Sequence, residues 1–461
     1  MPNHKAFTRS EEVFAWLSGF INFERGQSGK SFRLDRMRAL AEEAGHPETC
    51  APVIHIAGSK GKGSVTAMAS SILEEAGYKT ARYTSPHLLD YRERVTLGGD
   101  FFPEDLYLAA AGELRDILAK ARKHGFFDSG SSIGGEEPTF FELLTLYFFL
   151  CARCSECDAM VVETGLGGRL DATNIVNPSV SVISSIELEH TEFLGSTLAS
   201  IAGEKGGIIK EGRPLVLAPQ DEEALAVFRR LCREKKSPLA YLPEAARIGD
   251  ISISRTGTCF TLNLDGSPYR LELPLVGRIQ AQNAALAILA VREAFPGISM
   301  DIIARGLTQA ALSGRFERVH NDPPLVIDGA HTPQSARLAV ESFTGLYGSG
   351  GILLFGSVEG KNAAGMAEAL LPFFSRIIIT TPGDFKASKP DELFKLFREL
   401  AGQDRDITLI TSTGEAVIRA LALGREQKLP ILGTGSFYLA AEIKKAMSCG
   451  SRLAAMAEGK N

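Results

Sequence analysis

The stretch HIAGSKGKGSVTA, residues 55–67, joins an apolar run to a segment with helical periodicity, and it decides the fold of this part of the chain. Three glycines within it, Gly58, Gly61 and Gly63, alternate with small polar and basic residues. Successive backbone N–H groups of such a turn can cradle an anion, and the positive end of the following helix caps the cradle. The order of strand, glycine-rich turn and helix therefore predicts a phosphate-binding loop in an α/β domain.

The loop departs from the common phosphate-loop pattern GxxxxGK[ST] in two ways. That pattern needs glycine where this chain has Ile56, and it places the hydroxyl residue directly after the lysine. Here Gly63 stands between Lys62 and Ser64. We still expect Lys62 to reach the terminal phosphates and the Ser64 hydroxyl to bind Mg²⁺. The alternative is a glycine-rich turn with only a structural role.

Short β-branched apolar runs alternate with longer helical stretches on both sides of the loop. PVIHIAG (residues 52–58), AMVVETG (residues 159–165) and SVSVISS (residues 179–185) have the composition of buried strands that end at polar turns. This alternation predicts a mainly parallel sheet with helices on its faces. Residues 246–276 alternate with period two instead, which predicts antiparallel hairpins appended to the first domain.

A second series of strands and helices starts at LVIDGAH, residues 325–331, after the polar and proline-bearing residues 312–324. It continues through GILLFGS, RIIITT, DITLIT and PILGTGS, each followed by a helical stretch, and predicts a smaller Rossmann-like sheet. A length of 461 residues fits either two large domains or three ordinary ones. We predict two, residues 1–312 with the phosphate loop and the hairpins, and residues 313–461.

Composition and charge narrow the class of partner. The chain has 50 Lys plus Arg against 55 Asp plus Glu, and this net charge of −5 argues against a nucleic-acid-coating protein while permitting a local basic pocket. Charged residues run through the N-terminal segment, and the 7 cysteines lack a secreted-scaffold spacing, so we expect a cytoplasmic protein without a membrane partner. Cys151, Cys154 and Cys157 have CxxCxxC spacing, but without a fourth cysteine they are best interpreted as packing residues.

Six motifs occur in the order found in the folylpolyglutamate synthase and dihydrofolate synthase family, which the chain resembles from about residue 17 to about residue 440. They are GSKGKGS (58–64), SPHLLDYRERV (85–95), ETGLGGRLDATN (163–174), HTEFLG (190–195), EKGGIIK (204–210) and IDGAH (327–331). The resemblance implies an α/β protein with a P-loop-containing Mur-ligase-like central domain and a smaller Rossmann-like C-terminal glutamate-ligase domain.

The resemblance also implies an ATP-dependent ligase that adds L-glutamate to folates through an acyl phosphate. ATP and Mg²⁺ would be the cofactors, a reduced folate or dihydropteroate and L-glutamate the substrates, and a monomer the active form. We favour an enzyme with both folylpolyglutamate synthase and dihydrofolate synthase activity, because the motifs do not separate the two. The alternatives are a monofunctional dihydrofolate synthase and a phosphate-loop protein that binds ATP as a switch. The SPHL and LGGRLDATN motifs speak against a cell-wall Mur ligase.

Besides Ser64 of the loop, the resemblance implies three Mg²⁺ ligands: Ser85, Glu163 and His190. Independently of it, Ser85, Glu163 and His190 each follow a predicted strand, at the carboxyl edge where open α/β sheets bind ligands. Hydroxyl and carboxylate oxygens together with an imidazole suit a divalent cation. The alternatives are a turn serine before Pro86 and a structural histidine.

Catalytic roles are implied for Lys62, Lys205 and His190. Lys205 lies in the EKxG motif, whose lysine is carbamylated in many members of the family. Carbamylation requires a neutral amine, which implies a desolvated site and a lowered pKa. Without the motif, Lys205 would be interpreted as a solvated cation on a helix, and that alternative stays open.

The remaining site residues follow from the same resemblance. The ATP contacts are Gly58, Ser59, Lys60, Gly61, Lys62, Gly63, Ser64, Asn283, Arg315, Asp328 and His331, and the pterin contacts are Thr139, Phe140, Phe141, Glu142, Leu170, Asp171 and Ala172. Phe140 could stack on a flat heterocycle or pack in the core as part of an apolar helix face. Lys30, Arg33 and Arg36 either attract the anionic substrate or form a solvated face.

The chain departs from the family pattern at several positions, which leaves the choice of substrate open. Glu189 stands where aspartate is frequent, and the others are Ser196, Ile279, Lys60 and Thr332. None of these departures removes a proposed metal ligand.

Overall fold

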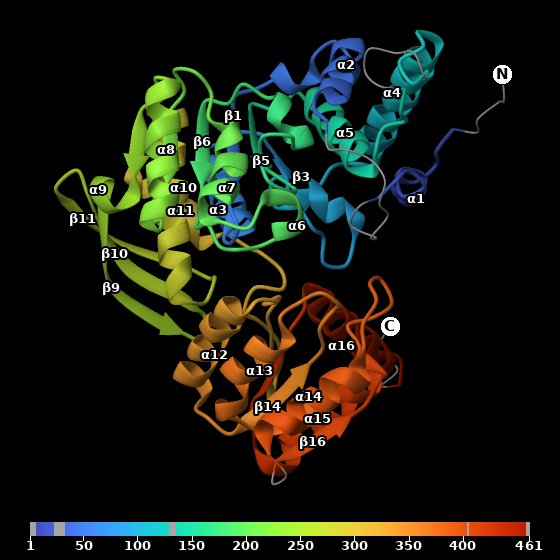
Figure 1. The fold of residues 1–461 in the computed structure, drawn as a ribbon, viewed down its shortest axis with the longest axis vertical. Coiled ribbons are helices and arrows are strands. Elements are labelled where there is room, and N and C mark those ends of the chain that lie inside the picture. Colours follow the sequence, from blue (N-terminus) through green and yellow to red (C-terminus); the bar gives the residue numbers. More distant parts are fainter. Residues whose placement is uncertain (1–5, 23–32, 129–134, 403–404, 458–461) are drawn as a thin grey trace. The chain divides into compact units, whose positions relative to one another are not determined.

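The computed structural model describes residues 6–22, 33–128, 135–402 and 405–457 of the 461-residue chain (Figure 1). These residues form two compact units. The N-terminal unit comprises Met1–Asp250, Phe260–Leu273 and Gln280–Ala311, and the C-terminal unit comprises Ile251–Cys259, Pro274–Ile279 and Leu312–Asn461. Parts of the predicted hairpin region therefore cluster with the C-terminal unit, while the domain boundary at residue 312 stays a prediction.

An eight-stranded sheet forms the centre of the N-terminal unit, in the order β4-β3-β2-β5-β1-β6-β7-β8. The strands are β1 (Val53–Ala57), β2 (Thr80–Tyr83), β3 (Val95–Leu97), β4 (Asp100–Phe101), β5 (Ala159–Glu163), β6 (Val180–Ile183), β7 (Leu215–Leu217) and β8 (Leu239–Tyr241). Strands β2, β5, β1, β6, β7 and β8 run parallel, and β3 and β4 add an antiparallel edge. Every residue of β1, β5 and β6 is buried, as the apolar runs predicted.

Helices connect and cover these strands (Figure 1). They are α1 (Ser10–Leu17), α2 (Asp35–Glu43), α3 (Lys62–Glu75), α4 (Glu104–Lys123), α5 (Phe140–Cys154), α6 (Thr191–Leu194), α7 (Leu198–Lys205), α8 (Glu222–Glu234), α9 (Leu242–Ala245), α10 (Arg278–Ala294) and α11 (Met300–Thr308). The 3₁₀ turns are η2 (Pro47–Thr49), η3 (Tyr91–Arg94), η4 (Ala172–Ile175) and η5 (Gly206–Ile208). Helix α11 packs on α3, α5 on α4, and α8 on α7.

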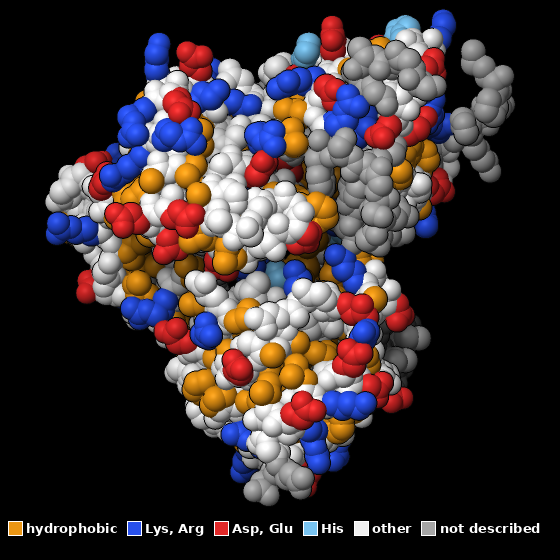
Figure 2. Space-filling model, viewed as in Figure 1, with side chains coloured by type: hydrophobic (Ala, Val, Ile, Leu, Met, Phe, Trp, Pro, Cys, Tyr) orange, Lys and Arg blue, Asp and Glu red, His pale blue; other side chains and the backbone are white. Residues whose placement is uncertain are grey.

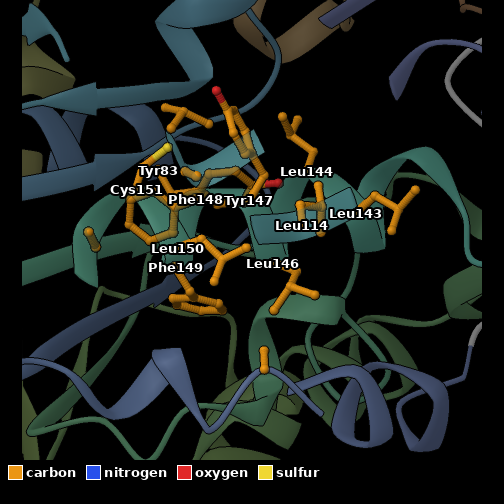
Figure 3. Packing of buried hydrophobic residues seen from close by; sticks show 14 of the residues in the cluster. Tyr83, Leu114, Leu143, Leu144, Leu146, Tyr147, Phe148, Phe149, Leu150 and Cys151 are labelled. Atoms are coloured by element: carbon orange, nitrogen blue, oxygen red, sulfur yellow. The ribbon is translucent and has the colours of Figure 1, made fainter. Parts of the chain in front are cut away.

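The core of the N-terminal unit is built around α5, which is apolar on nearly all sides. Figure 3 shows its apolar side chains, among them Leu143, Tyr147 and Cys151, clustered with Leu114 of α4 and Tyr83 of β2. Burial of each large apolar side chain contributes roughly 1.5–3 kcal/mol. Cys151 lies within this core, where burial raises the pKa of its thiol well above the usual value.

The antiparallel region forms a separate sheet in the order β11-β10-β9, from β9 (Ala246–Ser254), β10 (Gly257–Leu264) and β11 (Ser267–Leu273). Asp265 and Gly266 join the last two strands, with φ values of 51° and 77°. Both positive values suit the two-residue turn that an Asp-Gly pair favours in a hairpin.

The C-terminal unit contains a six-stranded sheet in the order β12-β13-β17-β14-β15-β16. Its strands are β12 (Glu317–Asn321), β13 (Pro324–Ile327), β14 (Gly351–Phe355), β15 (Phe374–Ile379), β16 (Asp406–Leu409) and β17 (Ile431–Thr434). Its helices are α12 (Pro333–Tyr347), α13 (Ala363–Leu370), α14 (Pro390–Ala401), α15 (Thr413–Gln427) and α16 (Phe437–Ala457), with the 3₁₀ turn η6 (Leu371–Phe373). All neighbouring strands except β12 and β13 are parallel, which is the arrangement predicted for a Rossmann-like sheet.

The surface carries both signs of charge. Figure 2 shows Lys and Arg side chains interspersed with Asp and Glu over the visible face. Within the described residues, no helix has both the length and the apolar character that crossing a membrane requires.

Candidate active site

The phosphate loop lies between the end of β1 and the start of α3, and its backbone is closely packed. Gly58 has φ 147° and Gly61 has φ 90°. A Cβ atom on Gly58 would overlap the hydroxyl of Ser184, and one on Gly61 would overlap the side-chain oxygen of Asn283. Side chains larger than hydrogen are therefore excluded at both glycines. The backbone N–H groups of Ser59 and Lys60 donate to the carbonyl oxygen of Ser185, at 2.9 and 3.4 Å, which leaves the N–H groups at the start of α3 for an anion.

Asn283, predicted as a nucleotide contact, lies buried on α10 against the phosphate loop. Its Nδ2 donates a hydrogen bond to Oε1 of Gln280 at 3.0 Å, which leaves Oδ1 turned toward Gly61. The structure thus places Asn283 where it supports the loop from the side.

Three lysines converge at the loop. Nζ of Lys62 and Nζ of Lys205 both donate to the carbonyl oxygen of Gly58, at 2.9 and 2.8 Å. Nζ of Lys205 also lies 3.1 Å from Oε1 of Glu189, and Nζ of Lys60 lies 3.6 Å from Oε2 of the same carboxylate. Glu187 is a second carboxylate near Lys60 and Glu189, so the three lysines face two carboxylates, and the remaining positive charge suits a polyphosphate.

Burial and charge act in opposite directions on the two central groups of this cluster. The side chain of Lys205 is only 2% exposed, and burial lowers its pKa to about 8 although Glu189 opposes the change. Burial acts to raise the pKa of Glu189, but the charges of Lys205, Lys62 and Lys60 outweigh it and lower that pKa to about 2. Lys205 is thus desolvated, as the carbamylation hypothesis requires, and it is also paired with a carboxylate.

Two of the proposed metal ligands lie at the ends of neighbouring strands. Glu163 is the last residue of β5 and is 3% exposed, and Ser85 follows β2, which pairs with β5. The backbone N–H of Ser85 donates to Oε2 of Glu163 at 3.4 Å. The structure therefore brings these two predicted residues together at the carboxyl edge of the sheet.

The other two proposed ligands occupy different elements. Ser64 is buried in the first turn of α3, and His190 precedes α6 with φ 47° and a side chain that is 40% exposed. Among the described residues, no three His, Cys, Asp or Glu side chains form a ready-made metal site. Hydroxyl and carboxylate oxygens with few protein ligands nevertheless fit Mg²⁺, which keeps water and substrate phosphates in its coordination shell.

The loop that carries Ser85 is held by its own residues. The Glu93 carboxylate accepts backbone hydrogen bonds from Leu88, Leu89 and Asp90, at 2.6, 3.0 and 3.0 Å. Three backbone donors on one carboxylate fix the path of the chain between Ser85 and η3. The SPHLLDYRERV motif thus forms a pre-organised loop.

The GLGGRLDATN and EKGGIIK motifs dock against each other through glycines. A Cβ atom on Gly168 would lie 2.8 Å from the carbonyl oxygen of Lys205, and one on Gly207 would overlap the backbone of Arg169. The backbone N–H of Arg169 donates to the carbonyl oxygen of Glu204 at 2.7 Å. This close backbone packing fixes the end of α7 and therefore the position of Lys205.

The predicted pterin contacts in the LDA segment are mostly turned inward. The buried carboxylate of Asp171 accepts the backbone N–H groups of Gly165 and Leu166, both at 2.9 Å. Burial raises the pKa of Asp171, and its hydrogen bonds oppose the change. Ala172 is also buried, whereas Leu170 is half-buried. Asp171 therefore organises the loop from within.

The PTFFE segment forms the capped start of α5. The Thr139 hydroxyl and the Glu142 carboxylate form a capping box, and both oxygens of Glu142 also accept hydrogen bonds from the guanidinium of Arg36. Phe140 is fully buried in the core, which favours packing over stacking on a substrate. Phe141 is half-buried and lies against Gly165, where a Cβ atom would overlap its ring.

The basic N-terminal residues have structural partners. Arg36 is 1% exposed and pairs with Glu142, so the interpretation of Arg36 as part of a solvated face is wrong. Arg33 pairs with Asp35. Lys30 lies outside the described residues.

In the C-terminal unit, three predicted nucleotide contacts surround the end of β13. The carboxylate of Asp328 accepts the backbone N–H groups of Phe316 and Ala330, at 2.9 and 2.8 Å. Burial raises its pKa, and Arg315 opposes the change. The Arg315 guanidinium lies 5.0 Å from the centre of the Phe437 ring, and Nδ1 of His331 donates to the carbonyl oxygen of Gly329 at 2.9 Å.

Sequence reasoning missed the role of Glu189 between the lysines. The sequence shows Glu189 only as a departure from the family pattern. Its place after a predicted strand and directly before His190 is the signal that puts it at the same sheet edge as the other site residues. It also missed the internal partners of Asp171 and Glu142, for which the sequence carries no local signal.

Two domain families match the chain in order. The Mur ligase middle domain matches residues 114–291, and the Mur ligase glutamate ligase domain matches residues 314–437. The chain is 31% identical over 451 residues to the dihydrofolate synthase/folylpolyglutamate synthase of Bacillus subtilis (strain 168), covering 96% of this chain and 100% of that relative. The chain belongs to the folylpolyglutamate synthase and dihydrofolate synthase family. The α/β fold with a Mur-ligase-like part and a second Rossmann-like part is thereby confirmed.

Solved structures of this family are similar to this chain over most of its length. Mycobacterium tuberculosis folylpolyglutamate synthase, complexed with ADP and AMPPCP, matches with a TM-score of 0.85 and 28% identity over 95% of this chain and 98% of that one. E. coli FolC in complex with DHPP and ADP matches with a TM-score of 0.82 and 26% identity over 97% of this chain and 99% of that one. Family members with this fold therefore bind adenine nucleotides.

Proposed function

We propose that this chain is an ADP-forming ligase that adds L-glutamate to folates, as a folylpolyglutamate synthase that also acts as a dihydrofolate synthase on dihydropteroate. The position of Lys62, whose Nζ donates to the carbonyl oxygen of Gly58, carries the proposal, because it places a positive charge directly at the phosphate loop. The B. subtilis and E. coli relatives, named for both activities or solved with DHPP and ADP, support the choice of substrates.

The first step is phosphoryl transfer. A carboxylate oxygen of the folate substrate attacks the γ-phosphorus of ATP, and the bond from that phosphorus to the bridging oxygen breaks. ADP leaves with the bridging oxygen, and the substrate becomes an acyl phosphate. Backbone N–H groups of residues 61–64 hold the phosphates, because those of Ser59 and Lys60 already donate to the carbonyl oxygen of Ser185, and Lys62 exchanges the Gly58 carbonyl for a phosphate oxygen. Mg²⁺, held by Ser64, Ser85, Glu163 and His190, would offset the charge on the phosphates.

The second step forms the amide. The amine of L-glutamate attacks the acyl carbon, the bond from that carbon to the phosphate oxygen breaks, and phosphate leaves while the amine loses a proton to solvent. This chain's contribution is to hold the reactants in place and to exclude water from the acyl phosphate. Arg315, Asp328 and His331 complete the nucleotide contacts in this proposal, and Phe141, half-buried beside Gly165, faces the pterin. The proposed active form is a monomer.

ADP release tests the proposal directly. With ATP, Mg²⁺ and L-glutamate present, we expect both dihydropteroate and tetrahydrofolate to stimulate ADP release and to become glutamylated. Lys62→Ala is expected to lower the rate by roughly 100-fold or more, because it removes a positioned charge from the transferring phosphoryl group. Lys123→Ala, at the exposed end of α4, is the matched control and keeps the wild-type rate.

The alternatives give different outcomes in the same assay. Stimulation by dihydropteroate alone would indicate a monofunctional dihydrofolate synthase. If neither substrate stimulates ADP release, the ligase proposal is overturned in favour of an ATP-binding switch. Unchanged glutamate incorporation by Lys62→Ala would contradict the assignment of the loop.

A further inference from the structure

Three buried polar side chains, His55, Thr173 and Asp171, form a hydrogen-bonded network next to the active-site loops. None of them has a role in the two chemical steps of the proposed ligase reaction. The network begins at His55, in the middle of β1, three residues before Gly58. The imidazole is fully buried in an otherwise apolar strand. Burying a polar group without a hydrogen bond costs free energy, so a histidine at this position needs a partner.

That partner is Thr173, in η4. Nε2 of His55 lies 2.8 Å from Oγ1 of Thr173, and Oγ1 of Thr173 lies 2.5 Å from Oδ1 of Asp171. All three side chains are buried. The hydrogen-bonded network therefore connects the central strand β1 to the LDAT segment, residues 170–173, through two side-chain hydrogen bonds.

The direction of both bonds follows from counting protons. Asp171 accepts the backbone N–H groups of Gly165, Leu166 and Thr173, and its Oδ1 also accepts the single hydroxyl proton of Thr173. The Thr173 oxygen must then accept from His55, which requires the proton on Nε2. Nδ1 of His55 has no hydrogen-bond partner among the described residues, which agrees with an unprotonated nitrogen at that position. Burial, together with the charge of Lys210, lowers the pKa of His55 to about 3, so the ring is neutral.

Asp171 connects this hydrogen-bonded network to the active site. Its second oxygen, Oδ2, accepts the backbone N–H groups of Gly165 and Leu166. Gly165 follows Glu163 by two residues and packs against Phe141. The orientation of the His55 ring therefore affects the position of the loop that follows Glu163, a proposed metal ligand.

We propose that His55 is a positioning residue, which acts through Thr173 and Asp171 to hold the loop after Glu163 in register with the strand that enters the phosphate loop. It touches neither substrate nor nucleotide. The inference rests on the proposed function, because its kinetic consequence is a slower ligase. Its structural content, a neutral Nε2–H imidazole that holds Thr173, stands without that activity.

Paired variants separate the hydrogen bond from the bulk of the side chain. Thr173→Val removes the hydroxyl and keeps the shape, whereas Thr173→Ser keeps the hydroxyl. His55→Met removes the donor, whereas His55→Gln can place an amide N–H near Nε2. We expect Thr173→Val and His55→Met each to lower kcat by about 10- to 100-fold, because each leaves a buried group unpaired at the loop, with KM for ATP changed less than threefold. Thr173→Ser and His55→Gln should keep kcat within about threefold of wild type.

The double variant and a distant control complete the kinetic test. His55→Met/Thr173→Val should lose no more than Thr173→Val alone, since Thr173→Val already removes the hydrogen bond that His55→Met removes. Thr380→Val removes a buried hydroxyl that donates to the carbonyl of Thr411 in the C-terminal unit, and it should leave kcat unchanged. A Thr173→Val enzyme with wild-type kcat, or a Thr173→Ser enzyme as slow as Thr173→Val, would overturn the proposal.

A spectroscopic readout does not depend on turnover. In ¹⁵N NMR of histidine-labelled protein, the resonances lost in His55→Gln should show a protonated Nε2 and an unprotonated Nδ1 from pH 5 to 8, and Thr173→Val should shift the Nε2 resonance. A protonated Nδ1 would overturn the inference. Wild-type protein that makes no ADP but gives the expected NMR pattern would refute the proposed function and leave the hydrogen-bonded network standing.

Discussion

Lys205 and Glu189 form a buried ion pair at the phosphate loop, and the two side chains set each other's charge. Burial disfavours the ammonium, whereas the carboxylate 3.1 Å away favours it. The balance leaves the pKa of Lys205 at about 8, well below the ordinary value of 10.5. The amine is therefore within reach of the neutral form near physiological pH, and only that form reacts with CO₂.

Carbamylation of Lys205 should depend on pH with a definite sign. Because the pKa of Lys205 is lowered to about 8, the neutral amine and hence the carbamate increase as the pH rises through 8, and both decrease below it. We expect ¹³C NMR in ¹³C-bicarbonate to show a carbamate signal that is present at pH 8.5, weak at pH 6 and absent in Lys205→Ala. A surface-lysine variant, Lys123→Ala, should retain the signal.

The absence of any Lys205-dependent signal at pH 8.5 would contradict carbamylation. Lys205 would then act as an ammonium paired with Glu189. Crystals equilibrated with bicarbonate give an independent check, because density beyond Nζ would show the added group.

The limits of sequence reasoning are clearest for single side chains. Lys62 and Ser64 were placed at the start of a helix after the loop because their positions follow from local sequence, and the structure has them there. Arg36 and Glu142 are 106 residues apart in the sequence. No local pattern can therefore predict that the Glu142 carboxylate is paired with this arginine. Phe140 and Phe141 are adjacent and chemically identical, and only the orientation of α5 decides that the first is buried and the second lies beside Gly165.

At the scale of elements, the loop after β5 and the end of α7 are locked together by glycines. Gly168 approaches the backbone of Lys205, and Gly207 approaches that of Arg169, with no room for a side chain at either. The six motifs could be recognised in the sequence. Their contact could not be predicted, because it depends on how two loops that are distant in the sequence fold onto the same edge of the sheet. The sheet itself was predictable, since alternating buried runs and helices leave few other arrangements.

Alanine at Gly207 or Gly168 should displace Lys205. The added Cβ meets backbone atoms that cannot rotate away, so we expect each substitution to destabilise the N-terminal unit by about 1–3 kcal/mol and to lower ADP release. Gly203, on α7 with open space around it, is the matched control. Gly203→Ala should stabilise by about 0.5–1 kcal/mol, because alanine favours the helix. Urea denaturation measures these changes, and equal effects at Gly203 and Gly207 would refute the docking argument.

At the scale of the whole molecule, each compact unit has a hydrophobic core of its own. One core surrounds α5 in the N-terminal unit, and another surrounds Phe343, Phe355 and Phe397 in the C-terminal unit. The latter also takes in Val276, which precedes the main part of that unit in the sequence. The predicted boundary at residue 312 does not assign Val276 to the C-terminal unit, because the sequence around one buried valine in a hairpin region does not indicate which domain it packs in.

Two separate cores predict two unfolding transitions with different responses to nucleotide. The chain has 1 tryptophan, Trp16 of α1, so its fluorescence reports the N-terminal unit, whereas far-UV circular dichroism reports both units. A non-hydrolysable ATP analogue at about 100 times its Kd should stabilise the unit that holds its phosphates by about 2.7 kcal/mol. Because the phosphate loop lies in the N-terminal unit, the fluorescence transition should move to higher temperature, and a second transition seen only by circular dichroism should move less.

Lys62→Ala, which weakens phosphate binding, should abolish the shift in fluorescence without lowering the transition of the ligand-free protein. A single coincident transition for both probes, shifted equally by the analogue, would mean that the two cores unfold as one cooperative unit.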